Sequence, residues 1–283
     1  MASEIQGLPE ADRETKDGAG VGLARDSGLG ANHEAVEVGR IMGSSLSSIV
    51  NRIASLLPSV DSAAPTGKVS HRTGTPYLPG LPALSETDAR DLLVDVWVRS
   101  APSDFEPSGH IETEVPYPGL PRARCDLLFS TSGWASETPE WAIELKRIQF
   151  VGDNGKNNDF NVQKMLSPYL KDRSLIHDIE RMKTYPLASR HAVIGYAFSY
   201  SFSSCSVAES MHSTELDRIN NIREVCRRND AVGGHLSSSD LISSADLFFK
   251  SRGVVRDFAV APFTGVWRHP CGGDGSVFGW EVA

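Results

Sequence analysis

The sequence has few cysteines, and none of them form a metal-binding pattern. Its four cysteines are Cys125, Cys205, Cys226 and Cys271, and no C-x2-C pair occurs. Structural zinc sites are normally built from such closely spaced pairs. The spacing therefore argues against a zinc site and predicts small buried or idle thiols.

Long apolar runs are also absent. No stretch approaches the roughly 18 apolar residues that a membrane-spanning helix needs. The N-terminal stretch MASEIQGLPEADRETKDGAG is polar and acidic, unlike a secretory signal or an Arg-rich transit peptide. We therefore expect a cytoplasmic protein with no membrane partner.

The chain lacks the overall positive charge that is typical of nucleic-acid-binding proteins. Its formal net charge is -8 at pH 7. The charge is unevenly distributed, because residues 1–40 hold four Lys and Arg against eight Asp and Glu, whereas residues 146–190 hold nine against five. Local fields rather than the chain average guide a polyanion. A nucleic-acid partner for the second segment therefore stays open.

The composition is that of a globular protein with appendages. With 283 residues, of which 40% are hydrophobic and 23% charged, the chain can bury a sizeable core. Residues 1–33 contain few large apolar side chains, and we expect a disordered acidic tail there. Apolar residues at helical spacing predict an amphipathic helix over 34–57. This helix either packs on the main domain or mediates a homodimer.

A stretch rich in Pro, Gly and Ser, residues 58–84, predicts a linker. Residues 85–283 form the predicted main domain, which opens with a helix that is capped by Ser85 and runs to about Ser100. Three strands, a helix, a strand, a helix and two closing strands are predicted to follow, over 110–116, 123–130, 140–150, 168–184, 191–200, 215–228, 258–267 and 276–282. This order predicts an α/β fold with a central mixed sheet flanked by helices.

The segment WAIELKRI, residues 141–148, combines an apolar strand pattern with two opposite charges. Alternation along a strand puts its large apolar residues on one face, and Glu144 and Lys146 on the other, roughly 7 Å apart. If the preceding strand pairs across the 131–139 loop, Asp126 comes beside Glu144. Two carboxylates and a lysine would then converge on one spot.

Such a convergence has a chemical use. Neighbouring carboxylates repel each other unless a positive charge lies between them, and hard oxygen ligands with open coordination positions suit Mg2+. A lysine beside the metal can hold the attacking water, which completes the parts needed to hydrolyse a phosphodiester. The alternative is a same-face ion pair on a solvated sheet surface, which contributes only about 0–1 kcal/mol.

Asp126 followed by Glu144-Leu145-Lys146 resembles the D…(D/E)-x-K motif of the PD-(D/E)xK nuclease superfamily, to which restriction endonucleases belong. The predicted element order over residues 85–200 is also similar to the restriction endonuclease-like core of that family. The resemblance implies that Asp126, Glu144 and the backbone carbonyl of Leu145 hold Mg2+, for which Mn2+ can substitute. It implies that Lys146 positions the attacking water.

Many members of this family add an acid from the first core helix or strand. Glu86, Glu112 and Glu114 are the candidates in this chain, and Glu114 is favoured as a further metal ligand.

Basic residues downstream of the motif are candidates for contact with nucleic acid. A helix N-terminus attracts anions, and four basic residues precede or lie on the predicted helix over 168–184: Lys164, Lys171, Arg173 and Arg181. A solvated helix face is the alternative.

These observations predict a Mg2+-dependent nuclease that acts on DNA, as an endonuclease of restriction or defence type. The alternative is a non-catalytic nucleic-acid-binding or protein-interaction module on the same fold.

Overall fold

The computed structural model describes residues 44–65, 69, 74, 76–106, 108–131, 136–156, 165–167, 174–229, 235–236 and 238–283. The chain divides into two units, Met1–Val38 and Gly39–Ala283, and every described residue belongs to the second. The predicted tail over 1–33 and the first part of the predicted helix, up to residue 43, lie outside the described residues.

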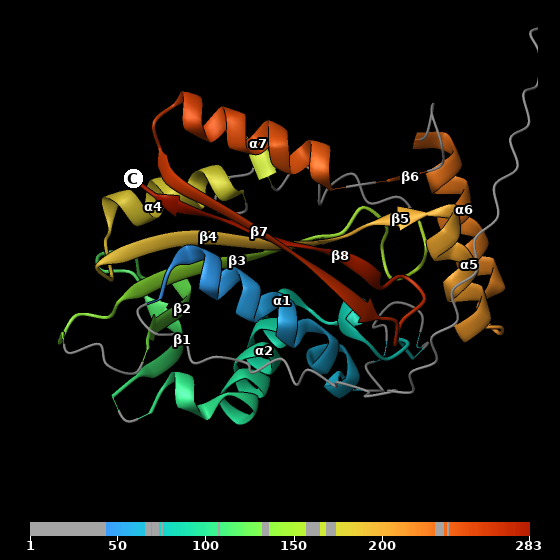
Figure 1. Ribbon diagram of the computed structural model, residues 1–283, viewed down its shortest axis with the longest axis horizontal. Coiled ribbons are helices and arrows are strands. Elements are labelled where there is room, and N and C mark those ends of the chain that lie inside the picture. The colour runs from blue at the N-terminus through green and yellow to red at the C-terminus, as the bar shows by residue number, and fades with distance from the viewer. Residues whose placement is uncertain are drawn as a thin grey trace, which may run out of the picture. The chain divides into compact units, whose positions relative to one another are not determined.

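A six-stranded mixed sheet forms the centre of the second unit (Figure 1). Its strands are β1 (His110–Pro116), β2 (Arg124–Ser130), β3 (Trp141–Ile148), β4 (Arg190–Phe198), β7 (Val255–Val266) and β8 (Gly273–Val282). Their spatial order is β1-β2-β3-β4-β8-β7. β3 pairs with β4 in parallel, and the other neighbours pair antiparallel. The mixed α/β fold predicted from the sequence is confirmed.

Helices cover both faces of this sheet. They are α1 (Leu46–Ala63) and α2 (Glu86–Ser100) on one face, and α4 (Leu175–Thr184) and α7 (Ser239–Ser251) on the other. Successive side chains of a strand point to opposite faces, and two residues of β8 show the arrangement. A Cβ atom at Gly279 would lie 3.3 Å from Val50 of α1, whereas the Trp280 indole donates to Asp246 of α7 at 3.1 Å. Figure 1 shows α1 and α7 on the two sides of the sheet.

The predicted three-strand meander and crossover are present. β1, β2 and β3 pair in sequence order, and α4 lies between β3 and β4 in the chain. A crossover is needed here because neighbouring parallel strands cannot be joined by a tight turn. α2 begins as predicted, because the Ser85 hydroxyl accepts from the backbone N–H of Asp88 at 3.0 Å in a capping box.

α1 extends further than the sequence predicted, so the predicted helix end at residue 57 was wrong. The helix begins at Leu46 and continues through Pro58 to Ala63. The predicted linker over 58–84 therefore starts in helix, and it also contains a short 3-10 helix, Leu81–Ala83.

Contacts with distant segments explain why α1 passes Pro58, a residue that disfavours a helix interior. The buried carboxylate of Asp61 accepts from the backbone N–H of Leu81 at 2.7 Å and of Arg268 at 2.8 Å. These hydrogen bonds fix the last turn of the helix. Local composition gave no sign of them.

The apolar face of α1 belongs to the core of the second unit. It packs on β7, β8 and α2. Its buried apolar residues are Leu46, Ile49, Val50, Ile53, Ala54, Leu56, Leu57 and Val60. Of the two interpretations of this helix, packing on the main domain therefore holds for its described part.

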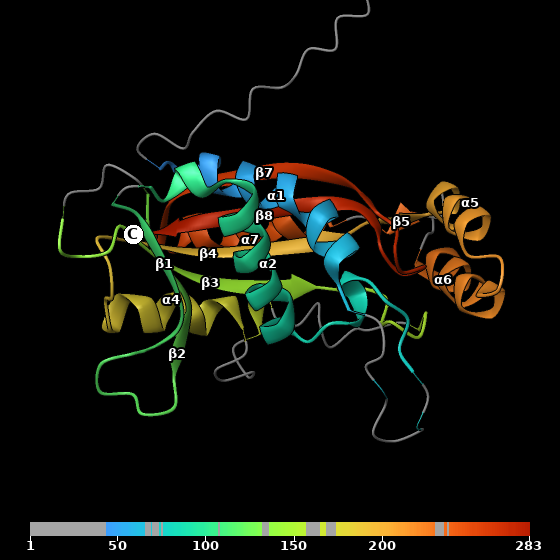
Figure 2. The same cartoon turned by 90° about the horizontal axis from the view of Figure 1, so that it is seen from below.

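A second group of elements lies at the end of the sheet away from β1 and β2 (Figure 2). It comprises β5 (Tyr200–Ser201), α5 (Phe202–Met211), α6 (Leu216–Asn229) and β6 (His235–Leu236). α6 was predicted, whereas α5 and α7 were not. The serine-rich segment of α5 has little apolar periodicity. A capping box formed by Ser201 and Ser204 starts α5. None of the described helices is long and apolar enough to cross a membrane.

Candidate functional site

The β2–β3 ladder ends where the charged residues of β3 begin. Leu127 pairs with Ile143 in the last ladder position. Beyond it, the Asp126 carboxylate accepts the backbone N–H of Leu145 at 2.8 Å through Oδ2. This carboxylate takes the hydrogen bond that a strand partner would otherwise accept. It is thereby held between β2 and β3, and the next step of the register puts it across from Glu144.

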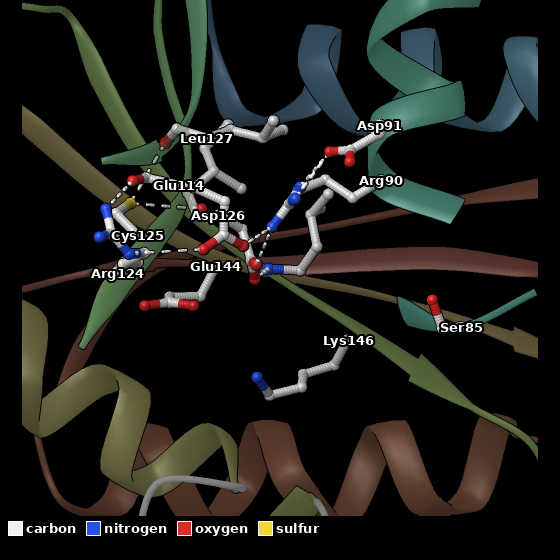
Figure 3. Close-up of polar contacts among 12 residues, drawn as sticks. Ser85, Arg90, Asp91, Glu114, Arg124, Cys125, Asp126, Leu127, Glu144 and Lys146 are labelled. Carbon is white, nitrogen blue, oxygen red and sulfur yellow. Dashed lines mark hydrogen bonds and ion pairs between the residues drawn. The ribbon is translucent and has the colours of Figure 1, made fainter. Parts of the chain in front are cut away.

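Asp126, Glu144 and Lys146 line one cavity of about 620 Å3. The rest of its lining consists of Glu114, Leu120, Pro121, Arg122, Ala123, Arg124 and Arg181. Figure 3 shows Asp126 on β2 near Glu144 and Lys146, which both extend from β3. The structure therefore brings the three motif side chains together, as strand pairing across the 131–139 loop predicted.

Glu144 is buried and hydrogen-bonded. Its Oε1 atom accepts from the Tyr117 hydroxyl at 2.8 Å and from Arg181 Nη2 at 3.0 Å. Burial, and then the neighbouring carboxylates of Asp178 and Asp126, raise the pKa of Glu144 to about 8, against the opposing charges of Lys146 and Arg181. This carboxyl group therefore takes up a proton more readily than an ordinary glutamate does.

Lys146 is held from the α4 side of the sheet. Its ammonium nitrogen lies 3.1 Å from Oδ2 of Asp178, whose side chain is fully buried. Asp178 also pairs with Arg181, one turn further along α4. Burial lowers the pKa of Lys146, but the carboxylates of Asp178 and Glu144 outweigh it and raise the pKa above its ordinary value. The lysine therefore stays charged.

Arg90 of α2 reaches the site from another side and pairs with the carboxylates of β1 and β2. Its guanidinium group pairs with Asp91 at 2.6 Å, with Asp126 at 3.2 Å and with Glu114 (Figure 3). Glu114 has a φ of +56°, in the left-handed region that non-glycine residues rarely adopt. Asp126 is thus already neutralised by a nearly buried cation that the sequence did not predict.

The other predicted residues divide into three groups. Lys164, Lys171 and Arg173 lie outside the described residues, and Arg181 lines the cavity. Of the three candidate acids, Glu114 lines the cavity. Glu86 instead accepts from the backbone N–H of Arg147 at 3.4 Å, and Glu112 is exposed beside His110.

The chemistry of the donor set fits a hard divalent cation. Asp126 and Glu144 supply carboxylate oxygens, and the Leu145 carbonyl faces the same edge as its N–H, because a strand residue turns both groups toward one neighbour. Among the described residues, no group of three or more His, Cys, Asp or Glu side chains is arranged to hold a metal ion. Mg2+ commonly takes one or two carboxylates and keeps several waters, so two carboxylates and a carbonyl suffice.

Two arginines hold the oxygens that a metal ion would use. Arg90 contacts Oδ1 of Asp126, and Arg181 contacts Oε1 of Glu144. A cation entering the cavity would therefore have to compete with one or both guanidinium groups. This competition is the strongest structural constraint on metal binding here.

Sequence reasoning missed Asp178, Arg90 and Tyr117 as members of this site. Asp178 and Arg181 are three residues apart on α4, and helical spacing puts such residues on one face. That signal could have linked Asp178 to Arg181. Arg90 and Tyr117 carry no comparable local signal, because the site carboxylates that they contact lie on strands distant in the chain.

No protein-family model, curated protein or solved structure matches this chain. The resemblance to the PD-(D/E)xK nucleases therefore rests on the motif residues and on the order of the elements.

Proposed function

We propose that this protein is a Mg2+-dependent nuclease that hydrolyses phosphodiester bonds of DNA, as an endonuclease of restriction or defence type. The observation that carries the proposal is the convergence of Asp126, Glu144 and Lys146 on one cavity. Two carboxylates can hold a metal ion that activates water, and a lysine beside them can position that water.

Each residue has a role in this proposal. Asp126, Glu144 and the Leu145 carbonyl would hold Mg2+ or Mn2+, which supplies charge neutralisation and Lewis acidity when bound. Lys146 orients the attacking water by hydrogen bonding. Asp178 holds the Lys146 ammonium at the cavity wall.

One arrangement of charges favours a second candidate, a non-catalytic nucleic-acid-binding or protein-interaction module. Arg90 and Arg181 already pair with Asp126 and Glu144. A site that is neutralised by its own arginines needs no metal ion for stability. In that case the cluster serves the fold alone.

The proposal includes the setting of the reaction. The nuclease would act in the cytoplasm on nucleic acid, without a membrane partner. Cleavage of both DNA strands needs two sites, which a homodimer would supply. The apolar face of the described part of α1 is used within the protomer, so such a dimer would form through another surface.

Plasmid nicking tests the proposal. Purified protein is incubated with supercoiled plasmid and Mg2+ or Mn2+, with a chelator as the blank. We expect nicking that Glu144→Ala and Lys146→Ala each reduce by roughly a hundredfold or more. Glu112→Ala is the matched control, because this exposed acid of β1 does not line the cavity.

The same assay separates the two candidates. Nicking in the presence of metal that is lost in both variants supports the nuclease. If the wild-type protein cleaves neither DNA nor RNA, and calorimetry detects no Mg2+ or Mn2+ binding, the non-catalytic module is the correct interpretation.

A further inference from the structure

One wall of the cavity is the turn that joins β1 to β2, residues 117–123. Leu120, Pro121 and Arg122 of this turn line the cavity, and so does Arg124 at the start of β2. The sequence had placed contacts with nucleic acid near α4, on the other side of the motif. The turn therefore adds a second basic wall to the site.

The turn has a defined conformation. The backbone N–H of Tyr117 donates to the carbonyl of Ala123 at 3.1 Å, and that of Leu120 donates to Tyr117 at 3.1 Å. Gly119 has a φ of +75°, which a glycine adopts without strain. Pro118 and Pro121 lie on either side of Gly119 and Leu120, and each proline ring fixes the φ angle of its own residue. The backbone that carries Arg122 is therefore ordered before any ligand binds.

Tyr117 anchors the turn directly on the motif. Its side chain is buried, and its hydroxyl donates to Glu144 at 2.8 Å. The Arg181 guanidinium lies over its ring, 5.3 Å from the ring centroid. The position of the basic wall is thus fixed relative to the carboxylates.

The two arginines of this wall differ from the other cations of the cavity. The side chains of Lys146 and Arg181 are only 12% and 11% exposed, and both pair with buried carboxylates. Arg124 is 48% exposed, donates from Nη1 to the Glu114 carbonyl at 2.9 Å, and has its Nε 3.9 Å from the Glu114 carboxylate, whose side chain is 44% exposed rather than buried. Arg122 is exposed, and it makes no ion pair or hydrogen bond with any residue that the structure describes. These two guanidinium groups are the ones that a ligand can reach.

We propose that Arg122 and Arg124 bind phosphates of a nucleic-acid strand that enters the cavity, close to the bond that faces Asp126 and Glu144. The planar guanidinium fork matches two phosphate oxygens. Phosphate contacts fix the position of the strand and carry no base information. This inference rests on the proposed function and names the wall of the site that takes the substrate.

Fluorescence anisotropy with a labelled DNA duplex, in buffer with a chelator so that no cleavage occurs, tests the inference. We expect Arg122→Ala and Arg124→Ala each to weaken binding by roughly tenfold. Each should also reduce the slope of log affinity against log salt by about 1. Arg122→Lys and Arg124→Lys keep the charge and should keep the slope. Arg228→Ala is the matched control, since this exposed arginine lies on α6.

The outcomes separate this inference from the proposed function. If the wild-type protein nicks plasmid while both alanine variants bind DNA with unchanged affinity and salt slope, the inference is wrong and the nuclease stands. An equal loss in Arg228→Ala would also refute it, because the effect would then be one of overall charge. If the wild-type protein neither binds nor cleaves nucleic acid, both fail. Circular dichroism of each variant checks that the fold is intact, and the lysine variants report on the site where an alanine variant does not fold.

Discussion

The ammonium nitrogen of Lys146 and the Oδ2 atom of Asp178 lie 3.1 Å apart, and the Asp178 side chain is fully buried. The two residues come from β3 and α4. A buried carboxylate that meets both Lys146 and Arg181 fixes the direction of two cations at once. The motif lysine is therefore held by a residue that lies outside the motif.

Asp178→Asn should lower the cleavage rate while leaving the affinity for DNA nearly unchanged. The neutral amide keeps the shape but loses the charge that holds Lys146, so a loss of about tenfold or more in kcat is expected. Single-turnover cleavage and DNA binding measure the two quantities separately. Glu180→Gln on the same helix is the control, because this acid is 67% exposed.

A second measurement on Asp178→Asn does not depend on activity. We expect Lys146 to react faster with an amine-modifying reagent such as acetic anhydride, because its ammonium loses its buried partner. Peptide mass spectrometry measures the rate at this lysine. Equal labelling rates in the wild-type protein and the variant would show that Asp178 does not hold Lys146.

Arg90→Met should tighten the binding of Mg2+. Arg90 pairs with Asp126 Oδ1 at 3.2 Å and with Glu114, so it competes with a metal ion for these oxygens. Removing this positive charge from beside the metal-binding carboxylates should raise the affinity for Mg2+ by about tenfold, or 1.4 kcal/mol. Calorimetric titration with Mg2+ measures it. Arg99→Met is the matched control on α2, since Arg99 is exposed and pairs with Asp95.

A lower Mg2+ affinity in Arg90→Met would contradict this prediction. It would mean that Arg90 positions Asp126 for the metal ion and does not compete with it.

His269 should make the protein less stable in acid. Burial lowers the pKa of His269 to about 3, from an ordinary value of 6.5. Below pH 6.5 the His269 side chain binds a proton in the unfolded chain but not in the folded protein. Stability therefore falls by about 1.4 kcal/mol for each pH unit until the pH reaches the folded pKa. Above pH 6.5 this residue makes no such contribution.

The variant that checks this is His269→Asn. The asparagine side-chain oxygen can still accept the backbone N–H of Cys271, which donates to His269 Nδ1 at 3.0 Å. Urea unfolding between pH 7 and pH 4 should then show a weaker pH dependence than in the wild-type protein. The prediction fails if the two curves of stability against pH are parallel.

Asp104→Leu should destabilise the fold strongly. Asp104 is fully buried, pairs with Arg52 at 2.9 Å and accepts from the Trp97 indole at 2.8 Å. Its removal leaves a buried guanidinium group without its counter-ion, at a cost of about 3–5 kcal/mol. Urea unfolding followed by tryptophan fluorescence measures the loss.

A double variant isolates the cause of this loss. Arg52→Met with Asp104→Leu replaces the buried pair by apolar side chains, an exchange that is often nearly neutral. It should recover most of the stability lost in Asp104→Leu. A double variant as unstable as the single one would assign the loss to packing around Trp97.

Much of the fold could be predicted from local patterns. The capping box at Ser85, the strands β1 to β3 and the apolar run of β4 lie where the sequence indicated. These signals are strong because each depends on neighbours in the chain. α5 and the end of α1 were missed, because distant contacts and serine-rich capping decide them.

The candidate site was predictable in part for the same reason. Asp126, Glu144 and Lys146 converge because strand pairing across a short loop follows from the sequence pattern. The prediction also expected a metal ion to balance the carboxylates. It did not include Arg90 from α2 or Asp178 from α4. The residue pattern of a strand predicts which side chains share a face, but it does not predict which helix packs on that face.

The sequence by itself determined which residues form strands and which face of β3 carries Glu144 and Lys146, since both follow from backbone geometry and side-chain alternation. Only the tertiary structure decided the partners of those charges. The partners reach the motif from two helices and a turn: Arg90 from α2, Asp178 and Arg181 from α4, and Tyr117 from the turn after β1. A buried charge must find a counter-ion or a hydrogen bond wherever the fold provides one, and that position depends on packing between segments far apart in the chain.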